Sequence, residues 1–300
     1  MATTQGEEGP TTERLMLPML YLDTLWVQVT GTVCNIACKH CFISCGPKVE
    51  RHRMMSAPDV IQALDDGVSA GLRSIWFTGG EPFLHPEILA LIDAALQRAP
   101  LGILSNGVLI DEPMAQALGE RFASAPYNLE LRISLDGCTP EDNDRVRGRG
   151  VFAAAVAGIE RLASHGLEPV VAVSLLDDAD AASADQASFV QLLREHGVSR
   201  PRVKWIPPFR IGRERSRRGG RAYRSWERLT AGDLLEPEAP LRLQCGTSRC
   251  VTSEGVFACP ILINEPGFRL GSQLSEAIRD HPVDHEACHT CWVEAFSCSV

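Results

Sequence analysis

Four cysteines lie close together near the N-terminus and could bind metal. Cys34, Cys38 and Cys41 form a C-x3-C-x2-C run, and Cys45 follows four residues later. Structural zinc sites usually take four ligands, often from two C-x2-C pairs. Three cysteine thiolates can instead bind three irons of a [4Fe–4S] cluster and leave the fourth iron free for another ligand. The spacing therefore favours an iron–sulfur cluster with one open site, and a zinc site is the alternative.

A second group of cysteines lies near the other end of the chain. Its six members are Cys245, Cys250, Cys259, Cys288, Cys291 and Cys298. This clustering predicts a second metal site rather than scattered core thiols. Two fully ligated cubane clusters need more cysteines than this group offers. Either one cluster takes four of them, most simply Cys245, Cys259, Cys288 and Cys291, or two clusters take three each. Zinc is again the alternative.

Three polar turns each follow an apolar run that reads as a strand. They are TGGEP at 78–82, SNG at 105–107 and SLDG at 134–137. Each is an ordinary turn sequence by itself. The carboxyl ends of parallel strands meet at one edge of an α/β sheet, where chemistry usually gathers. We therefore expect the three turns and the 34–45 cysteines to share one rim.

The rest of the chain alternates strand patterns with helix patterns. Six strands are predicted, at 25–30, 74–78, 101–104, 129–135, 169–175 and 202–206. Helices between them are expected to begin after Ser56, near Pro86 and after the Asp111 cap, and two more contain Phe152 and Phe189. The apolar face of the first is predicted as Val60, Ile61, Leu64 and Val68. This alternation predicts a parallel α/β sheet, and the element order alone does not distinguish an open sheet from a barrel.

Composition narrows the class of protein. The chain has 300 residues with 45% hydrophobic content, enough for one large domain with or without a small one. A net charge of −9 argues against a nucleic-acid binder. No apolar run approaches the ~18 residues that span a membrane, and the polar, acidic N-terminus differs from a signal peptide. A cytoplasmic location is the resulting prediction.

These motifs resemble the radical S-adenosylmethionine (SAM) superfamily, whose signature is C-x3-C-x2-C after the first strand. One departure is His40, where an aromatic residue commonly precedes the last cysteine, although an imidazole can still pack on the cluster. The resemblance implies a partial (β/α)6, TIM-like barrel over 22–210, after a tail at 1–21. An arginine-rich linker over 211–240 and a small C-terminal iron–sulfur domain over 241–300 complete the expected organisation.

The resemblance also implies a set of SAM-binding residues. The GGEP motif is expected to bind the SAM amino group through backbone groups and the acidic side chain, and the other turns to contact the rest of the cofactor. The implied residues are Gly79, Gly80, Glu81, Pro82, Ser105, Asn106, Ser134, Asp136 and Arg147. For Arg147, an exposed surface position is the alternative.

The C-terminal cysteines resemble the SPASM/twitch extensions, which carry one or two auxiliary [4Fe–4S] clusters. The matching pattern is Cys245, Gly255, Cys259 and Pro260, followed by the Cys288–Cys291 pair. We predict one complete auxiliary cluster. Such clusters often accept an electron from the substrate, so this resemblance points to net oxidation, cross-linking or epimerisation.

The implied activity is reductive cleavage of SAM to a 5′-deoxyadenosyl radical, which abstracts hydrogen from the substrate. The substrate is a peptide, a protein or a small molecule, and an external flavodoxin- or ferredoxin-type reductant is the expected partner. The alternatives are a dehydrogenase of an aminosugar-type compound and a non-enzymatic zinc or iron–sulfur module. Cys138, after SLDG, is a candidate hydrogen donor, and an ordinary loop cysteine is the alternative.

A dense basic segment precedes the C-terminal cysteines. Its members are Arg210, Arg213, Arg215, Arg217, Arg218, Arg221 and Arg224. Two interpretations are open: a surface that attracts an acidic peptide or a phosphorylated substrate, or a solvated, mobile linker.

Overall fold

The computed structural model describes residues 14–176, 185–217 and 222–294. Arg218, Arg221 and Cys298 lie outside the described residues. No helix in these three stretches is both long and apolar enough to cross a membrane.

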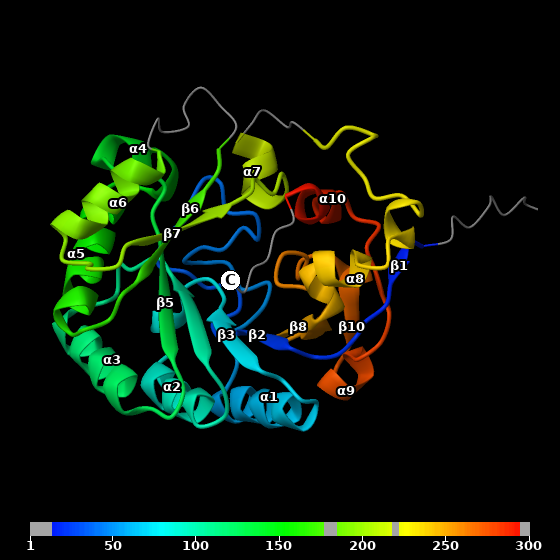
Figure 1. Cartoon of the computed structure of the whole chain (residues 1–300), viewed down its shortest axis with the longest axis horizontal. Helices are drawn as coiled ribbons and strands as arrows, with labels where there is room; N and C mark the ends of the chain where they lie inside the picture. Colours follow the sequence, from blue (N-terminus) through cyan, green and yellow to red (C-terminus); the bar gives the residue numbers. More distant parts are fainter. Residues whose placement is uncertain (1–13, 177–184, 218–221, 295–300) are drawn as a thin grey trace, which may run out of the picture.

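One large sheet organises the molecule (Figure 1). Its strands run in the order β10-β9-β8-β2-β3-β4-β5-β6-β7. Six consecutive parallel strands form the predicted unit: β2 (Thr24–Gln28), β3 (Ser74–Thr78), β4 (Leu101–Ser105), β5 (Leu129–Ser134), β6 (Val170–Ser174) and β7 (Arg202–Ile206). The predicted strands are confirmed, with ends that differ by up to two residues.

Helices cover the outside of these parallel strands (Figure 1). They are α1 (Ala57–Ser69), α2 (Ile88–Leu96), α3 (Glu112–Ser124), α4 (Pro140–Arg147), α5 (Val151–Ser164) and α6 (Gln186–Glu195). Side-chain caps begin two of them as predicted, because Ser56 accepts from the backbone of Asp59 and Asp111 accepts from that of Met114. Helix α4 was not predicted, since its charged sequence has no apolar period.

The buried face of α1 differs from the prediction. Ile61 and Val68 are 37% and 48% exposed, whereas Val60 and Leu64 are fully buried. Gly67 continues the buried face, because a Cβ there would lie 2.2 Å from the Leu72 side chain. The helix therefore approaches its neighbours closely at a small residue, while Ile61 and Val68 lie on its solvent side.

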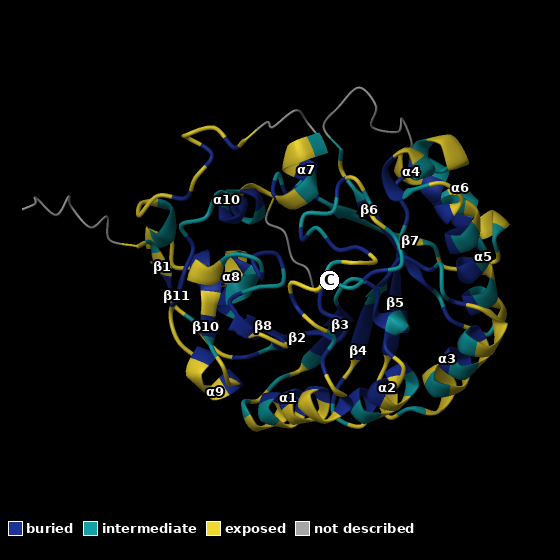
Figure 2. Ribbon diagram, turned by 180° about the vertical axis from the view of Figure 1, so that it is seen from behind, coloured by how far each residue is buried: buried dark blue, intermediate teal, exposed yellow. Residues whose placement is uncertain are grey.

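Alternation along the strands separates two kinds of interior. Leu25 and Val27 of β2 belong to the large apolar core, together with buried residues of the helices. The Trp26 side chain points to the opposite face of the sheet and stacks on Trp76 of β3, with ring centroids 5.3 Å apart. Figure 2 shows this layering, with buried strands inside and helices exposed on their outer sides. Every second strand residue thus faces the inside of the barrel.

The C-terminal region extends the same sheet. Strand β8 (Ser248–Thr252) pairs in parallel with β2, and β9 (Gly255–Phe257) and β10 (Arg269–Gly271) follow antiparallel. Buried Arg249 donates to the carbonyls of Ala277 and Cys245, both at 2.7 Å. The predicted boundary near 241 therefore separates two parts that share one sheet.

The segment predicted as a linker contains regular structure and buried side chains. It includes α7 (Gly212–Arg217), a 3-10 turn (Asp233–Leu235) and α8 (Ala239–Arg242). Tyr223, Leu229 and Ala239 are buried in a second apolar core with Trp292 of α10 (Glu286–Val293). A short two-stranded pair, β1 (Met16–Leu17) with β11 (His281–Pro282), adjoins it, and α9 (Leu274–Ala277) lies between β10 and β11. Where this segment is described, it packs rather than serving as a solvated linker.

Gly102 provides the space that Trp76 fills. A Cβ on Gly102 would lie 2.3 Å from the Trp76 ring. We expect Gly102→Ala to lower the free energy of unfolding by about 1–3 kcal/mol, because overpacking displaces the ring. Urea denaturation measures the change, and Gly232→Ala is the control, since the nearest atom there is 3.5 Å from the added Cβ. Equal stability of the Gly102 variant and the wild type would contradict this account.

Candidate active site

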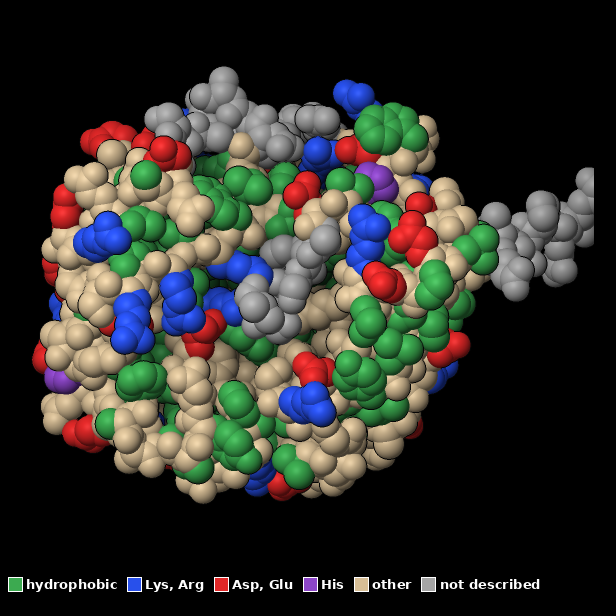
Figure 3. All heavy atoms as spheres, viewed as in Figure 1, with side chains coloured by type: hydrophobic (Ala, Val, Ile, Leu, Met, Phe, Trp, Pro, Cys, Tyr) green, Lys and Arg blue, Asp and Glu red, His purple; other side chains and the backbone are tan. Residues whose placement is uncertain are grey.

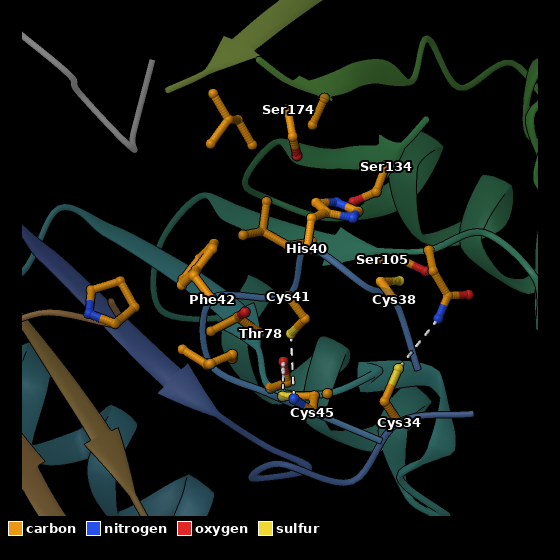
Figure 4. Close-up of a pocket in the computed structure, with 18 of the residues that line it drawn as sticks. Cys34, Cys38, His40, Cys41, Phe42, Cys45, Thr78, Ser105, Ser134 and Ser174 are labelled. Atoms are coloured by element: carbon orange, nitrogen blue, oxygen red, sulfur yellow. Dashed lines mark hydrogen bonds between the residues drawn. The ribbon is translucent and has the colours of Figure 1, made fainter. Parts of the chain in front are cut away.

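The first cysteine cluster opens onto a cavity of about 210 Å³ inside the barrel. Cys34, Cys38 and Cys41 line it together with Gly79 and Gly80 (Figure 4). The loop that carries the cysteines follows β2, and the glycines follow β3. The predicted meeting of these turns on one rim is confirmed.

Hydrogen bonds shape the surroundings of these thiols. The backbone N–H of Cys45 donates to Cys41 Sγ at 3.3 Å, and the Asn106 amide donates to Cys34 Sγ at 3.7 Å. The hydrogen bond from the Cys45 thiol is the largest of the influences on Cys41, and its pKa is lowered to about 6. Burial instead raises the pKa of Cys34 to about 12. Cys34 must therefore lose its proton when it binds a metal.

Glu81 lies behind the cavity wall. Its side chain is fully buried, and it is not among the residues that line the cavity. Its carboxylate accepts from Ser105 Oγ at 2.8 Å and from the N–H groups of Asn106 and Phe83 at 2.7 and 3.1 Å. Burial raises its pKa to about 7 despite these donors. In this geometry Glu81 joins the ends of β3 and β4, and its contact with SAM stays a prediction. Pro82, also buried, begins the short turn behind it.

A buried ionic cluster supports the opposite side of the site. Asp136 Oδ2 lies 2.6 Å from Arg147 Nε and 3.0 Å from His40 Nε2. Burial opposes ionisation of Asp136, but Arg147 and His40 outweigh it and hold the pKa well below its ordinary value. Asp136 does not line the cavity and positions His40 and Arg147, which both do, so its contact with SAM stays a prediction.

Arg147 is 7% exposed, which excludes the surface alternative. Ser105, Asn106 and Ser134 line the cavity as predicted. The strands add residues that the sequence analysis missed, among them Trp26, Gln28, Arg132, Ser174 and Lys204. Both polar atoms of the Gln28 side-chain amide are buried. Strand alternation is the signal that could have found these residues.

The hydrogen-donor role predicted for Cys138 is not supported by its position. This residue is partly buried against the large apolar core and does not line the cavity. Burial raises its pKa to about 11, and Asp142 and Asp185 add to that shift. The thiol thus lies beside the helices after β5 and β6, because the turn after SLDG leads away from the rim.

Four C-terminal cysteines surround a second, narrower pocket. They are Cys245, Cys259, Cys288 and Cys291. Burial raises the pKa of Cys245 to about 12. Cys250 lies apart from this pocket, fully buried in a third apolar cluster beside Trp26 and Phe257. The simplest predicted set of four is thus the set that shares a pocket, and Cys250 is not part of it.

Lysine and arginine side chains gather around the middle of the face shown in Figure 3. The first cavity is lined by four of them, Arg132, Arg147, Lys204 and Arg213, and by no aspartate or glutamate among the described residues. Its lining therefore favours negatively charged groups, which include cysteine-ligated clusters and carboxylates.

A protein-family model for the radical SAM superfamily matches residues 29–177. The chain belongs to the radical SAM superfamily. Strands β3 to β6 and the three clustered cysteines lie within the matched region, β2 ends directly before it, and β7 lies beyond it. Superfamily members bind a [4Fe–4S] cluster and SAM.

Two curated relatives match well beyond this region. Mycofactocin maturase MftC of Mycobacterium ulcerans is 28% identical over 81% of this chain and 69% of its own length. MftC of Mycobacterium tuberculosis is 28% identical over 81% of this chain and 66% of its own length. The chain thus spans about two thirds of the length of these relatives.

Two solved structures share the fold. SuiB of Streptococcus suis, bound to precursor peptide SuiA, has a TM-score of 0.63 at 14% identity, covering 88% of this chain and 66% of SuiB. The structure of anSMEcpe with bound AdoMet has a TM-score of 0.59 at 16% identity and covers 90% of this chain and 83% of that chain. The predicted partial barrel is confirmed.

The residues of the two pockets fit the superfamily's cofactors. Cysteine thiols are the usual cluster ligands, and the first cavity presents four of them, Cys34, Cys38, Cys41 and Cys45, beside Gly79 and Gly80. Within the described residues, no three His, Cys, Asp or Glu side chains converge on a single metal ion. The fit therefore rests on the donor chemistry and on the shared cavities.

The role assigned to Glu81 can be tested without SAM. Glu81→Ala leaves three buried donors without their acceptor, which costs about 1–3 kcal/mol for each. We expect a loss of at least about 3 kcal/mol in the free energy of unfolding, measured by urea denaturation of the SAM-free protein. Glu87→Ala is the control, because Glu87 is exposed and makes no capping hydrogen bond. If Glu81→Ala is as stable as the wild type but binds SAM more weakly, the result would instead support a direct contact between Glu81 and SAM.

Proposed function

We propose that this protein is a radical SAM maturase that modifies a peptide or protein substrate. The observation that carries this proposal is a shared wall between the two cysteine pockets. Pro260 and Ile261, which directly follow Cys259, line both pockets. A cluster held by Cys259 would therefore lie next to the cavity where a substrate radical forms, as an electron acceptor must.

The cofactors supply the radical chemistry when they are bound: the reduced cluster and SAM give a 5′-deoxyadenosyl radical that abstracts hydrogen. The chain's own residues position them. Cys34, Cys38 and Cys41 would hold the cluster that binds SAM. Backbone groups of Gly79 and Gly80 face the cavity beside it and would bind the SAM amino acid moiety.

His40 and Arg147, fixed by Asp136, form another part of the wall. Arg147 is the residue proposed to bind the SAM carboxylate, because its guanidinium reaches the cavity from a buried position. Ser134, Ser105 and Asn106 supply further polar groups. The apolar Trp26, Ile36 and Phe42 limit the access of water to the radical.

The peptide class of substrate rests on the relatives. SuiB is bound to a precursor peptide in its structure, and MftC is named a maturase. Another relative, AlbA of Bacillus subtilis, is named a bacteriocin biosynthesis protein and is 28% identical over 60% of this chain and 39% of its own length. The choice between oxidation, cross-linking and epimerisation, and the flavodoxin- or ferredoxin-type reductant, remain predictions.

The assignment of the SAM-cleaving cluster predicts a selective loss. The variant with Cys34, Cys38 and Cys41 all replaced by Ala is expected to keep iron at the C-terminal pocket and to form no 5′-deoxyadenosine with dithionite and SAM. Iron analysis and chromatography of the products measure both quantities. Continued SAM cleavage by this variant would reject the assignment.

The C-terminal pocket is predicted to hold one complete auxiliary cluster. Reconstituted protein should contain about eight iron atoms per chain, and Cys288→Ser with Cys291→Ser should reduce this to about four. SAM cleavage should remain measurable in that variant, because the first cluster is untouched. About twelve iron atoms would indicate two auxiliary clusters, and stoichiometric zinc would make the pocket a structural site.

A further inference from the structure

The segment after β7 packs directly on the loop that carries the first cysteines, residues 34–45, here called the cluster loop. Phe209 contacts Phe42 with ring centroids 5.4 Å apart. Gly212 has a φ of 56°, and a Cβ there would lie 2.1 Å from the Phe42 carbonyl oxygen. Only glycine fits this approach, so the chain beyond the barrel is built to touch the loop.

Arg213 makes most of the polar contacts between these two segments. Its Nε donates to the carbonyl of Cys38 at 2.8 Å, and its Nη2 donates to the carbonyl of Cys45. Its backbone N–H donates to the carbonyl of Cys41 at 3.1 Å and to Ser44 Oγ at the same distance. One residue thus holds the backbone of the cluster loop at Cys38 and Cys41 and at its C-terminal end, Cys45.

The cluster loop needs such support. Ser44 has a φ of 57°, and it is the one non-glycine residue with positive φ in the described parts of the chain. This left-handed conformation costs roughly 1 kcal/mol or more and persists only where the surroundings fix it. The contacts of Arg213 with Ser44 and with the Cys41 carbonyl fix this conformation, and they come from the segment that follows β7.

Arg213 also brings a permanent positive charge to the cavity, which its side chain lines. Both groups that accept hydrogen bonds from its guanidinium are neutral carbonyls, so neither cancels the charge. Asp136 already balances Arg147 across the site. The field of Arg213 thus acts on whatever the thiols bind.

We propose that Arg213 is a positioning residue for the cluster that binds SAM. Its hydrogen bonds fix the conformation of the cluster loop, and its charge favours the reduced state of the cluster. This inference rests on the proposed function, because it takes Cys34, Cys38 and Cys41 as the cluster ligands. Reduction transfers one electron from the external flavodoxin- or ferredoxin-type reductant to the cluster and makes it more negative. A fixed cation nearby stabilises that charge and raises the reduction potential.

The experiment compares reconstituted wild type with Arg213→Met and Arg213→Lys. Arg215→Met is the matched control, because Arg215 lies on the same helix but is exposed and pairs with Glu286. A redox titration follows the electron paramagnetic resonance signal that SAM perturbs, which isolates the first cluster from the C-terminal one. Incubation with bathophenanthroline disulfonate gives the rate at which that same signal is lost.

Arg213→Met is expected to lower the ratio of reduced to oxidised cluster about tenfold at a fixed potential, a shift of about 59 mV for one electron. Its cluster should also be lost about tenfold faster, since two charge-assisted hydrogen bonds are gone. Arg213→Lys should keep the potential near that of wild type and lose the cluster faster, because lysine keeps the charge but not the forked contacts.

Unchanged potential in Arg213→Met, or unchanged cluster loss in Arg213→Lys, would overturn the inference. If Arg213→Met does not fold by circular dichroism, Arg213→Lys decides through its rate of cluster loss. Wild-type protein that forms no SAM-perturbed signal would instead reject the proposed function, so the two failures are distinguishable.

Discussion

Parallel strand pairing is the constraint on which the whole site depends. Because β2 to β7 all run in one direction, their carboxyl ends meet at one rim. The cluster loop, the GGEP turn, the SNG turn and the SLDG turn arrive at that rim from distant parts of the sequence. Side-chain alternation then places one set of strand residues against the helices and the other set, both apolar and polar, inside the barrel.

Buried carboxylates convert this convergence into a fixed geometry. Glu81 accepts from Ser105 and Asn106 and so joins two adjacent strand ends. Asp136 performs the same task between His40 and Arg147, which belong to different segments. Neither acid faces the cavity, which leaves its lining positive. Both acids thus hold in place the groups that line the cavity.

The C-terminal region extends the barrel sheet rather than standing beside it. Strand β8 pairs with β2, and Pro260 and Ile261 form part of the cavity wall. Asn264 donates to the Ile43 carbonyl in the cluster loop, and Arg213 of α7 donates to the Cys38 carbonyl of the same loop. Loss of the C-terminal region would therefore expose the first cysteine site as well as remove the second.

The sequence by itself indicated the superfamily, the six strands and the grouping of Cys34, Cys38 and Cys41. Spacing and periodicity are local properties that one chain displays directly. The sequence also indicated which four C-terminal cysteines group together. Only the tertiary structure decided the roles of Glu81, Asp136 and Cys138, since the direction of a side chain depends on what packs around its turn. The same holds for Arg213, which one interpretation of the sequence placed in a solvated linker: its partners are backbone carbonyls about 170 residues earlier, and no sequence pattern records them.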